Sequence, residues 1–121
     1  MLFTESICDN KLYLKLYKKG NFVACPFLTA YFLKNNLSQN RIGITTGKKV
    51  GNAVKRNRAR RIIRAAYRLN EINFPIGYDI VFVAREDIVD KKTGDIEKFF
   101  RKRLIEKINN DNKNSKNHNE K

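Results

Sequence analysis

The sequence predicts a two-layer α/β sandwich, an α+β or α/β fold in which helices pack on one mixed sheet. Its 121 residues suffice for one domain with a real core. The expected elements alternate in the order helix, strand, strand, helix, strand, helix, which requires helices lying on a sheet. The run "YDIVFVA" at 78–84 is apolar almost throughout, as is typical of a central strand covered on both faces.

The first half of the chain is predicted to hold one helix and two strands. Residues 9–19 are expected to form a helix that Gly20 ends. Residues 22–33, "FVACPFLTAYFL", are predicted to form one long strand in which Pro26 marks a bulge or an edge. Residues 41–46, "RIGITT", are the next strand. The helix carries one apolar stripe at i,i+4 spacing, made by Leu12, Tyr13, Leu16 and Tyr17.

The second half is predicted to hold a long helix, the central strand and a last helix. The long helix spans roughly 52–69, and a turn at 73–77 leads into the strand at 78–84. The last, amphipathic helix covers about 95–108. The remaining segment, 109–121, is rich in Asn and Lys without apolar anchors, so we expect a disordered polar tail.

Charge limits the partners of this chain more than it limits the fold. There are 26 Lys and Arg against 12 Asp and Glu, a net charge of +14, and no acid lies between Asp9 and Glu71. Such an excess predicts binding to nucleic acid or to an anionic membrane surface. No apolar run approaches the ~20 residues that span a bilayer. Cys8 and Cys25 lack metal-type spacing, so we expect reduced thiols and a cytoplasmic location.

The helix at 52–69 combines a packing face with a cationic face. At 100° per residue, one side collects Ala59, Ile62, Ile63 and Ala66. The other side collects Asn57, Arg61, Arg64 and Arg68, and Arg56 and Arg60 widen that stripe. Like charges at this spacing destabilise a helix by a few tenths of a kcal/mol per pair, and no acids alternate with them. The arginine stripe therefore predicts a surface that binds a polyanion, where guanidinium forks fit phosphates.

The kind of nucleic acid follows from the elements around this helix. Its N-terminus at 52–54 follows a glycine-rich turn, so free N–H groups and the helix dipole add an anion site, and Gly51 lets a phosphate backbone come close. A reader of the DNA major groove would show a helix-turn-helix, whereas this helix is flanked by strands. We therefore expect RNA and no DNA.

No self-sufficient enzyme site is expected in the protein. The one histidine, His118, falls in the predicted tail, so no Ser/His/Asp set can be assembled. The segment "GITTGKK" lacks the spacing of a nucleotide-binding loop. Glu86, Asp87 and Asp90 share one loop and resemble surface charge. We accordingly expect neither catalytic residues nor metal ligands in this chain.

The segment 48–68, "KKVGNAVKRNRARRIIRAAYR", resembles the signature of the bacterial ribonuclease P protein subunit. Its flanks agree, because "RIGITTGKKVGNAV" and "GYDIVFVAR" resemble the strands before and after that signature. The resemblance covers roughly 9–108. It implies a fold like that of a ribosomal protein domain, with a left-handed crossover between parallel strands, although about 98% of such crossovers are right-handed.

The resemblance also implies a function. The chain would be an RNA-binding domain over residues 1–108 that assists a catalytic RNA in removing the 5′ leader from precursor tRNA by endonucleolytic hydrolysis. Mg²⁺ would serve the assembly, held mainly by the RNA. The leader would bind in a cleft lined by Tyr13, Tyr17 and Tyr31. The residues expected to face the catalytic RNA are Lys48, Lys49, Asn52, Arg56, Asn57, Arg58, Arg60, Arg61, Arg64 and Arg68.

The sequence alone leaves other functions and other roles for the tyrosines open. A ribosomal or other structural RNA-binding protein could carry the same charge pattern without a role in tRNA processing. A membrane-surface protein is disfavoured, because the apolar side of the basic helix has no Trp or Phe to bury in acyl chains. Spacing alone allows the three tyrosines to be either core or cleft residues. The acidic start, "FTESICDN", departs from the family's usual basic segment, so no RNA contact is assigned to it.

Overall fold

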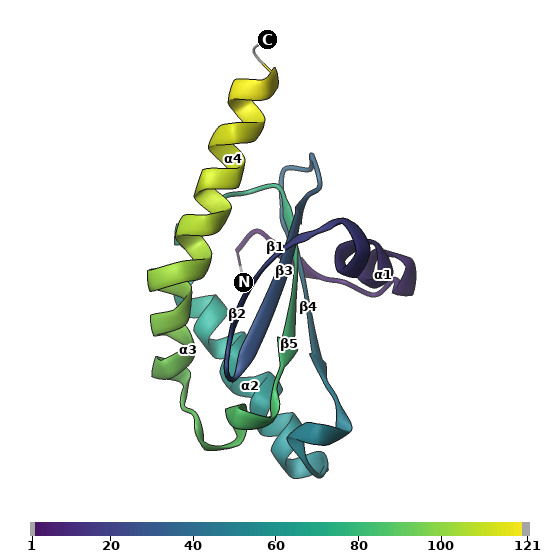
Figure 1. Ribbon diagram of the computed structural model, residues 1–121, viewed down its shortest axis with the longest axis vertical. Helices are drawn as coiled ribbons and strands as arrows, with labels where there is room; N and C mark the ends of the chain where they lie inside the picture. Colours follow the sequence, from purple (N-terminus) through teal and green to yellow (C-terminus); the bar gives the residue numbers. More distant parts are fainter. Residues whose placement is uncertain (1, 120–121) are drawn as a thin grey trace.

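A computed structural model describes residues 2–119, with side chains described as far as Lys113. Five strands form one sheet in the order β1-β4-β5-β3-β2, with α1 on one face and α2, α3 and α4 on the other (Figure 1). This confirms the predicted sandwich with a mixed sheet. The elements are β1 (Thr4–Ser6), α1 (Asn10–Lys19), β2 (Asn21–Cys25), β3 (Leu28–Lys34), β4 (Asn40–Thr46), α2 (Ala53–Asn70), β5 (Tyr78–Ala84), α3 (Thr93–Phe99) and α4 (Ile105–Asn119).

The sheet changes direction at its central strand. β5 runs parallel to β4 and antiparallel to β3, and β1 runs parallel to β4 at the far edge. The predicted strand at 78–84 agrees with β5, which is paired on both sides and buried almost throughout. Helix α2 makes the crossover from β4 to β5. The hand of that crossover stays a prediction from the family resemblance.

The prediction of one long strand at 22–33 is wrong, because the segment folds back as a hairpin. Cys25 pairs with Leu28, so Pro26 and Phe27 form a two-residue loop between β2 and β3. Proline suits such a turn because its φ is already fixed near the required value. The sequence does not show this turn clearly, because one of its two residues is apolar and is held by packing. Phe27 packs edge-on against Phe99 of α3, with ring centroids 6.3 Å apart.

Strand β1 was not predicted from the sequence. It has three residues, too few to show an alternating pattern, and is held by a residue far along the chain. The carboxylate of Glu71 accepts hydrogen bonds from the backbone N–H groups of Leu2 (2.8 Å) and Phe3 (3.1 Å) and from the Thr4 hydroxyl. This tertiary clamp places the N-terminal segment beside β4.

The C-terminal helix is longer than predicted. It begins with α3 at Thr93, passes through a π-helical turn at Phe100–Leu104 and continues as α4 to Asn119. The helix therefore extends beyond its predicted end at 108, while the expected disorder of the tail at 109–121 stays a prediction; 120–121 lie outside the described residues. One cause is Asp111, whose carboxylate accepts hydrogen bonds from the Tyr78 hydroxyl at 2.7 Å and from Asn21 Nδ2 at 3.1 Å.

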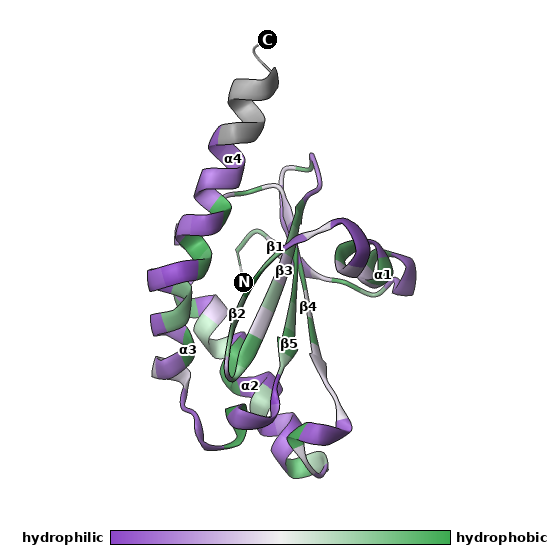
Figure 2. Ribbon diagram, viewed as in Figure 1, coloured by the Kyte–Doolittle hydropathy of each residue, from purple (hydrophilic) through white to green (hydrophobic). Residues whose placement is uncertain are grey.

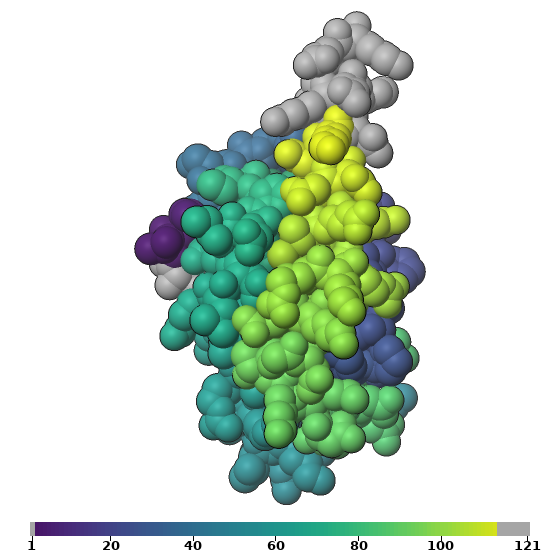
Figure 3. Space-filling model, turned by 90° about the vertical axis from the view of Figure 1, so that its left-hand side faces the viewer, coloured from purple at the N-terminus to yellow at the C-terminus, as the bar shows by residue number. Residues whose placement is uncertain are grey.

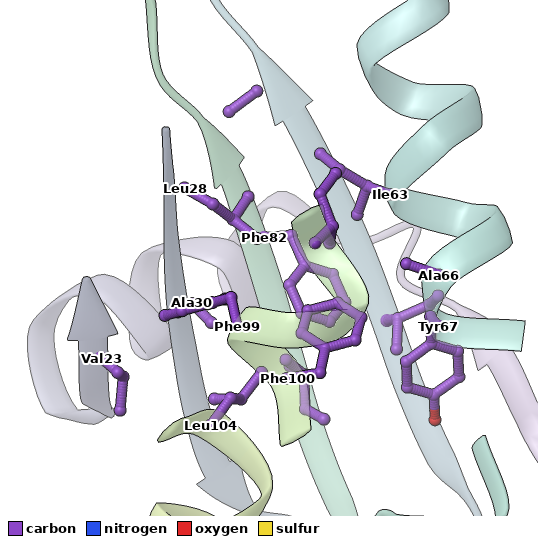
Figure 4. Close-up of a cluster of buried hydrophobic side chains, with 14 of the residues drawn as sticks. Val23, Leu28, Ala30, Ile63, Ala66, Tyr67, Phe82, Phe99, Phe100 and Leu104 are labelled. Carbon is purple, nitrogen blue, oxygen red and sulfur yellow. The ribbon is translucent and has the colours of Figure 1, made fainter. Parts of the chain in front are cut away.

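The main core lies between the sheet and the layer of α2 and α3. Figure 4 shows Phe82 of β5 stacked near Phe100, with Ile63 and Tyr67 of α2 on one side; the Phe82 and Phe100 centroids are 5.3 Å apart. A smaller cluster under α1 contains Leu16. In the ribbon coloured by hydropathy, the strands of the sheet are largely apolar, whereas polar residues recur along the helices (Figure 2). None of the described helices is long and apolar enough to cross a membrane.

Candidate nucleic-acid interface

Helix α2 has the two faces that its sequence predicts. Its inner face is buried against β4, β5 and α3 through Ala59, Ile62, Ile63, Ala66 and Tyr67. Asn52 caps the N-terminus, and its side-chain oxygen accepts from Lys55 N–H at 3.0 Å. Because packing fixes the inner face, the arginines on the opposite side are held toward solvent; Figure 3 shows the surface of α2 beside α3 and α4.

The arginine face of α2 contains a groove of about 390 Å³. Arg60 Nη1 donates to the Asn57 side-chain oxygen at 3.1 Å, which orients one guanidinium along the helix. No carboxylate lies among the groove's lining residues. A concave cationic surface of this kind suits a sugar–phosphate backbone. We call it the arginine groove; its lining residues are Asn57, Arg60, Arg61, Arg64, Ala65 and Arg68.

Within the described side chains, no ion pair is shown among the residues of the arginine groove. Arg41, outside the groove, binds Asp79 through two bonds, Nε–Oδ1 at 2.7 Å and Nη2–Oδ2 at 2.8 Å. Asp79 is 2% exposed, and Asn35 also donates to it. That pair links β4 to β5. Because no carboxylate lines the arginine groove, its positive charge is available to bind an external anion.

The other predicted RNA-binding residues occupy several different positions. Lys48 and Lys49 are exposed in a 3₁₀ turn, Lys48–Val50, that leads from β4 to α2. Arg56 is half-buried, and its Nε has no hydrogen-bond partner. Arg58 faces away from the arginine groove and donates to the carbonyls of Val89 (3.3 Å) and Lys91 (2.5 Å). Its guanidinium therefore ties α2 to the loop after β5, a contact that the sequence did not suggest.

The three predicted leader-binding tyrosines come together on the other face of the sheet. Tyr17 lies between its neighbours, with ring centroids 6.4 Å from Tyr13 and 5.1 Å from Tyr31. Tyr13 and Tyr31 are half-buried, and Tyr17 is 40% exposed. Tyr31 thus faces α1, as the cleft hypothesis requires. The rings form an open row along the edge of the helix rather than a closed core; their role in binding stays a prediction.

The tyrosine row meets the arginine side at a small pocket of about 180 Å³. Strand β1 pairs with β4 at 40–42, so the following part of β4 forms an uncovered edge of the sheet. Tyr13 reaches over Gly43 at this edge, and Arg60 and Arg64 approach from α2. Burial, with Tyr17 and Cys8 nearby, raises the pKa of the Tyr13 hydroxyl. The remaining lining residues are Ser6, Ile7, Ile42 and Ile44.

One exposed aromatic was missed in the sequence. Phe22 of β2 is 61% exposed and pairs across the hairpin with Tyr31, with ring centroids 5.8 Å apart. Recognising the turn at Pro26 would have revealed this cross-strand pair, because residues paired across a hairpin point to the same face. It extends the row of aromatic rings to the edge of the sheet.

The side chains that the structure describes include no group of three or more His, Cys, Asp or Glu that could hold a metal ion. The side chain of His118 lies outside the described residues.

Comparisons with known proteins agree on one family. The family model described as Ribonuclease P matches residues 2–109. The ribonuclease P protein component of Pelotomaculum thermopropionicum is 45% identical over 104 residues, which cover 86% of this chain and 93% of the relative. That of Clostridioides difficile is 44% identical over 96 residues, covering 78% and 84%.

Solved structures agree as well. The Staphylococcus aureus RNase P protein superimposes with a TM-score of 0.75 at 32% identity, covering 85% of this chain and 95% of that one. The Thermotoga maritima RNase P protein gives a TM-score of 0.72 and covers 86% and 94%; at 24% identity it supports the fold alone.

Proposed function

This chain belongs to the ribonuclease P protein family, and from that membership we propose how it works: it binds a catalytic RNA through α2 and the 5′ leader of precursor tRNA through its tyrosine row. The holoenzyme is an endoribonuclease that leaves a mature tRNA 5′ end. The protein's part is to hold two RNA segments in a fixed relation.

One observation carries this proposal: the arginine groove and the tyrosine row meet where Tyr13 lies over Gly43 beside Arg60 and Arg64. A protein that binds only structured RNA needs the cationic face alone. An open row of aromatic rings suits unpaired bases, because every base has a face that can stack, at ~1–3 kcal/mol per base. The junction supports contact with a folded RNA and a single strand together.

The proposed division of labour leaves the chemistry to the RNA. The described part of the chain offers no metal-binding cluster, and its two buried acids serve the fold: Asp79 pairs with Arg41, and Glu71 holds the N-terminal segment. Mg²⁺ would be held mainly by RNA phosphates. The arginines would reduce repulsion between the catalytic RNA and the incoming substrate, which is a positioning role.

The proposed place of action is the cytoplasm. Both cysteines are free thiols, Cys8 exposed and Cys25 half-buried, and burial raises the pKa of Cys25. Free thiols of this kind suit a reducing compartment.

The test is reconstitution with the cognate catalytic RNA. At low Mg²⁺ the purified protein should stimulate cleavage of precursor tRNA at the mature 5′ end, because it replaces part of the charge screening that the metal otherwise supplies. The protein without RNA should cleave nothing. Nuclease-free protein that cuts at the same position, or copurification with ribosomal RNA alone, would overturn the proposal.

A further inference from the structure

The row of aromatic rings does not stop at the three tyrosines. Successive centroid distances are 6.4 Å from Tyr13 to Tyr17, 5.1 Å to Tyr31 and 5.8 Å to Phe22. The row therefore crosses from α1 to β2, the last strand of the sheet. Phe22 is 61% exposed, so it contributes little to the core, and a large ring held in the open is suited to a contact with a ligand.

Beyond Phe22 lies a groove of about 550 Å³ between the edge of β2 and the C-terminal helix. Lys102 and Lys107 line it, and within the described side chains neither forms an ion pair. Glu106 is its acidic lining residue. We call it the β2-edge groove; its lining residues are Phe22, Val23, Ala24, Lys102, Arg103, Glu106, Lys107 and Asn110.

The backbone of β2 adds hydrogen-bonding groups to this groove. Because Cys25 and Leu28 close the hairpin, alternate residues bond to β3, and the N–H and C=O groups of Phe22 and Ala24 point away from the sheet. Arg103 confirms this direction, since its Nη1 donates to the Ala24 carbonyl at 2.8 Å. The groove therefore offers outward N–H donors beside two lysines, a combination suited to phosphate oxygens.

We propose that the β2-edge groove is a distal subsite for single-stranded RNA: nucleotides farther upstream in the leader stack on Phe22 and pass over the edge of β2, with phosphates beside Lys102 and Lys107. The inference rests on the proposed binding of the leader by the tyrosine row. Continuity with that row favours RNA over an acidic protein segment, because Phe22 supplies a stacking face next to the cations. Glu106 can accept from a base amino group and disfavours a phosphate at its own position.

Leader length is the variable that isolates this subsite. A short leader ends on the tyrosines, whereas a longer one reaches Phe22 and the lysines. The experiment reconstitutes the protein with its catalytic RNA and measures the Kd of precursor tRNAs with leaders of roughly 4 to 16 nucleotides, the range that a single-strand groove spans. With the wild-type protein, affinity should rise again when the leader becomes long enough to pass Tyr31.

Phe22→Ala should abolish that second rise. The expected loss is about 5-fold or more for long leaders, corresponding to one stacked base, with little change for short leaders or mature tRNA. Leu37→Ala is the matched control, because Leu37 is a 45% exposed apolar residue in the loop between β3 and β4. The melting temperature of both variants should stay close to that of the wild type, since neither side chain is buried.

Charge reversal tests the groove itself. Lys102→Glu with Lys107→Glu should weaken the binding of long leaders selectively. Lys11→Glu with Lys15→Glu on the exposed side of α1 changes the net charge equally and should affect all leader lengths alike. Because both double variants change the net charge equally, the difference between their affinities for long leaders reports the contribution of the β2-edge groove alone.

The outcomes separate the two proposals. If Phe22→Ala leaves the length dependence unchanged, or weakens all lengths equally, the distal subsite is wrong and the groove suits another occupant, such as an acidic protein segment. The proposed function survives that result if a short leader still improves binding over mature tRNA. If the wild-type protein gives no leader-dependent binding at any length, both proposals fail.

Discussion

The ring of Tyr13 lies directly over Gly43, so that a Cβ at residue 43 would overlap the tyrosine hydroxyl and lie 2.7 Å from Cζ. Gly43 is in the middle of β4, where a glycine ordinarily weakens a strand. Here its missing side chain makes room for the ring at the junction between the tyrosine row and the arginine groove.

Gly43→Ala should therefore displace Tyr13. We expect overpacking to lower the free energy of unfolding by about 1–3 kcal/mol and to weaken the binding of leader-bearing precursor tRNA. Tyr13→Ala removes the opposing ring, so the double variant should lose less stability than the sum of the two single variants. Denaturant unfolding of all four proteins measures this coupling; strictly additive losses would show that the ring and the glycine do not interact.

The arginine groove should dominate the salt dependence of RNA binding. In Arg61→Ala with Arg64→Ala, each lost phosphate contact should reduce the slope of log K against log salt by roughly 0.7–0.9. Binding of the catalytic RNA, titrated between low and moderate salt, gives this slope. An unchanged slope in a folded double variant would exclude this face as the RNA contact.

Arg58→Ala is the matched control for that experiment. Because Arg58 donates to the carbonyls of Val89 and Lys91, its loss should act on stability, by roughly 1.5 kcal/mol for bonds from a charged donor. The salt slope should stay near the wild-type value. A lowered slope with unchanged thermal stability would instead support the predicted RNA contact of Arg58.

Tyr17 should distinguish leader binding from packing. Tyr17→Ala should weaken the binding of precursor tRNA with a leader by ~1–3 kcal/mol, with little change for mature tRNA or for the catalytic RNA. Since Tyr17 is 40% exposed, the melting temperature of the variant should stay close to that of the wild type. Truncating a buried aromatic would instead lower the free energy of unfolding by ~3–5 kcal/mol. A large thermal loss with equal damage to both tRNA forms would assign Tyr17 to the core.

Glu71 should make the N-terminal segment sensitive to acid. Burial raises the pKa of its carboxyl, but the hydrogen bonds from Thr4, Leu2 and Phe3 outweigh this, and the pKa is lowered overall. A lowered carboxyl pKa contributes stability that is present above the ordinary value of about 4.3 and is lost as the pH falls through the lowered value.

The expected result is a loss of stability on acidification below about pH 4.3 that is smaller in Glu71→Gln than in the wild type. Glu86→Gln, at an exposed position, is the control and should follow the wild-type curve. Unfolding free energies measured across this pH range test the difference. If stability depends on pH identically in the wild type and in Glu71→Gln, protonation of the Glu71 carboxyl does not contribute to the acid sensitivity.

Local patterns in the sequence were sufficient for several features. The arginine stripe and buried face of α2 follow from a 3.6-residue period, and the limits of β5 follow from a continuous apolar run. The net charge of +14 indicated that the protein binds a polyanion. These predictions succeeded because each depends on neighbours within a few residues.

Tertiary structure decided everything that depends on residues far apart in the chain. Strand β1 exists because Glu71 binds the backbone of Leu2 and Phe3, and α4 extends past Ile108 where Asp111 meets Tyr78. The junction of Tyr13, Gly43 and Arg64 joins three elements that no periodicity relates. The sequence determined which face of each element is cationic or aromatic. Only packing in three dimensions decided that these faces meet along one edge of β4, because their contacts are set by the sheet's register and not by local propensity.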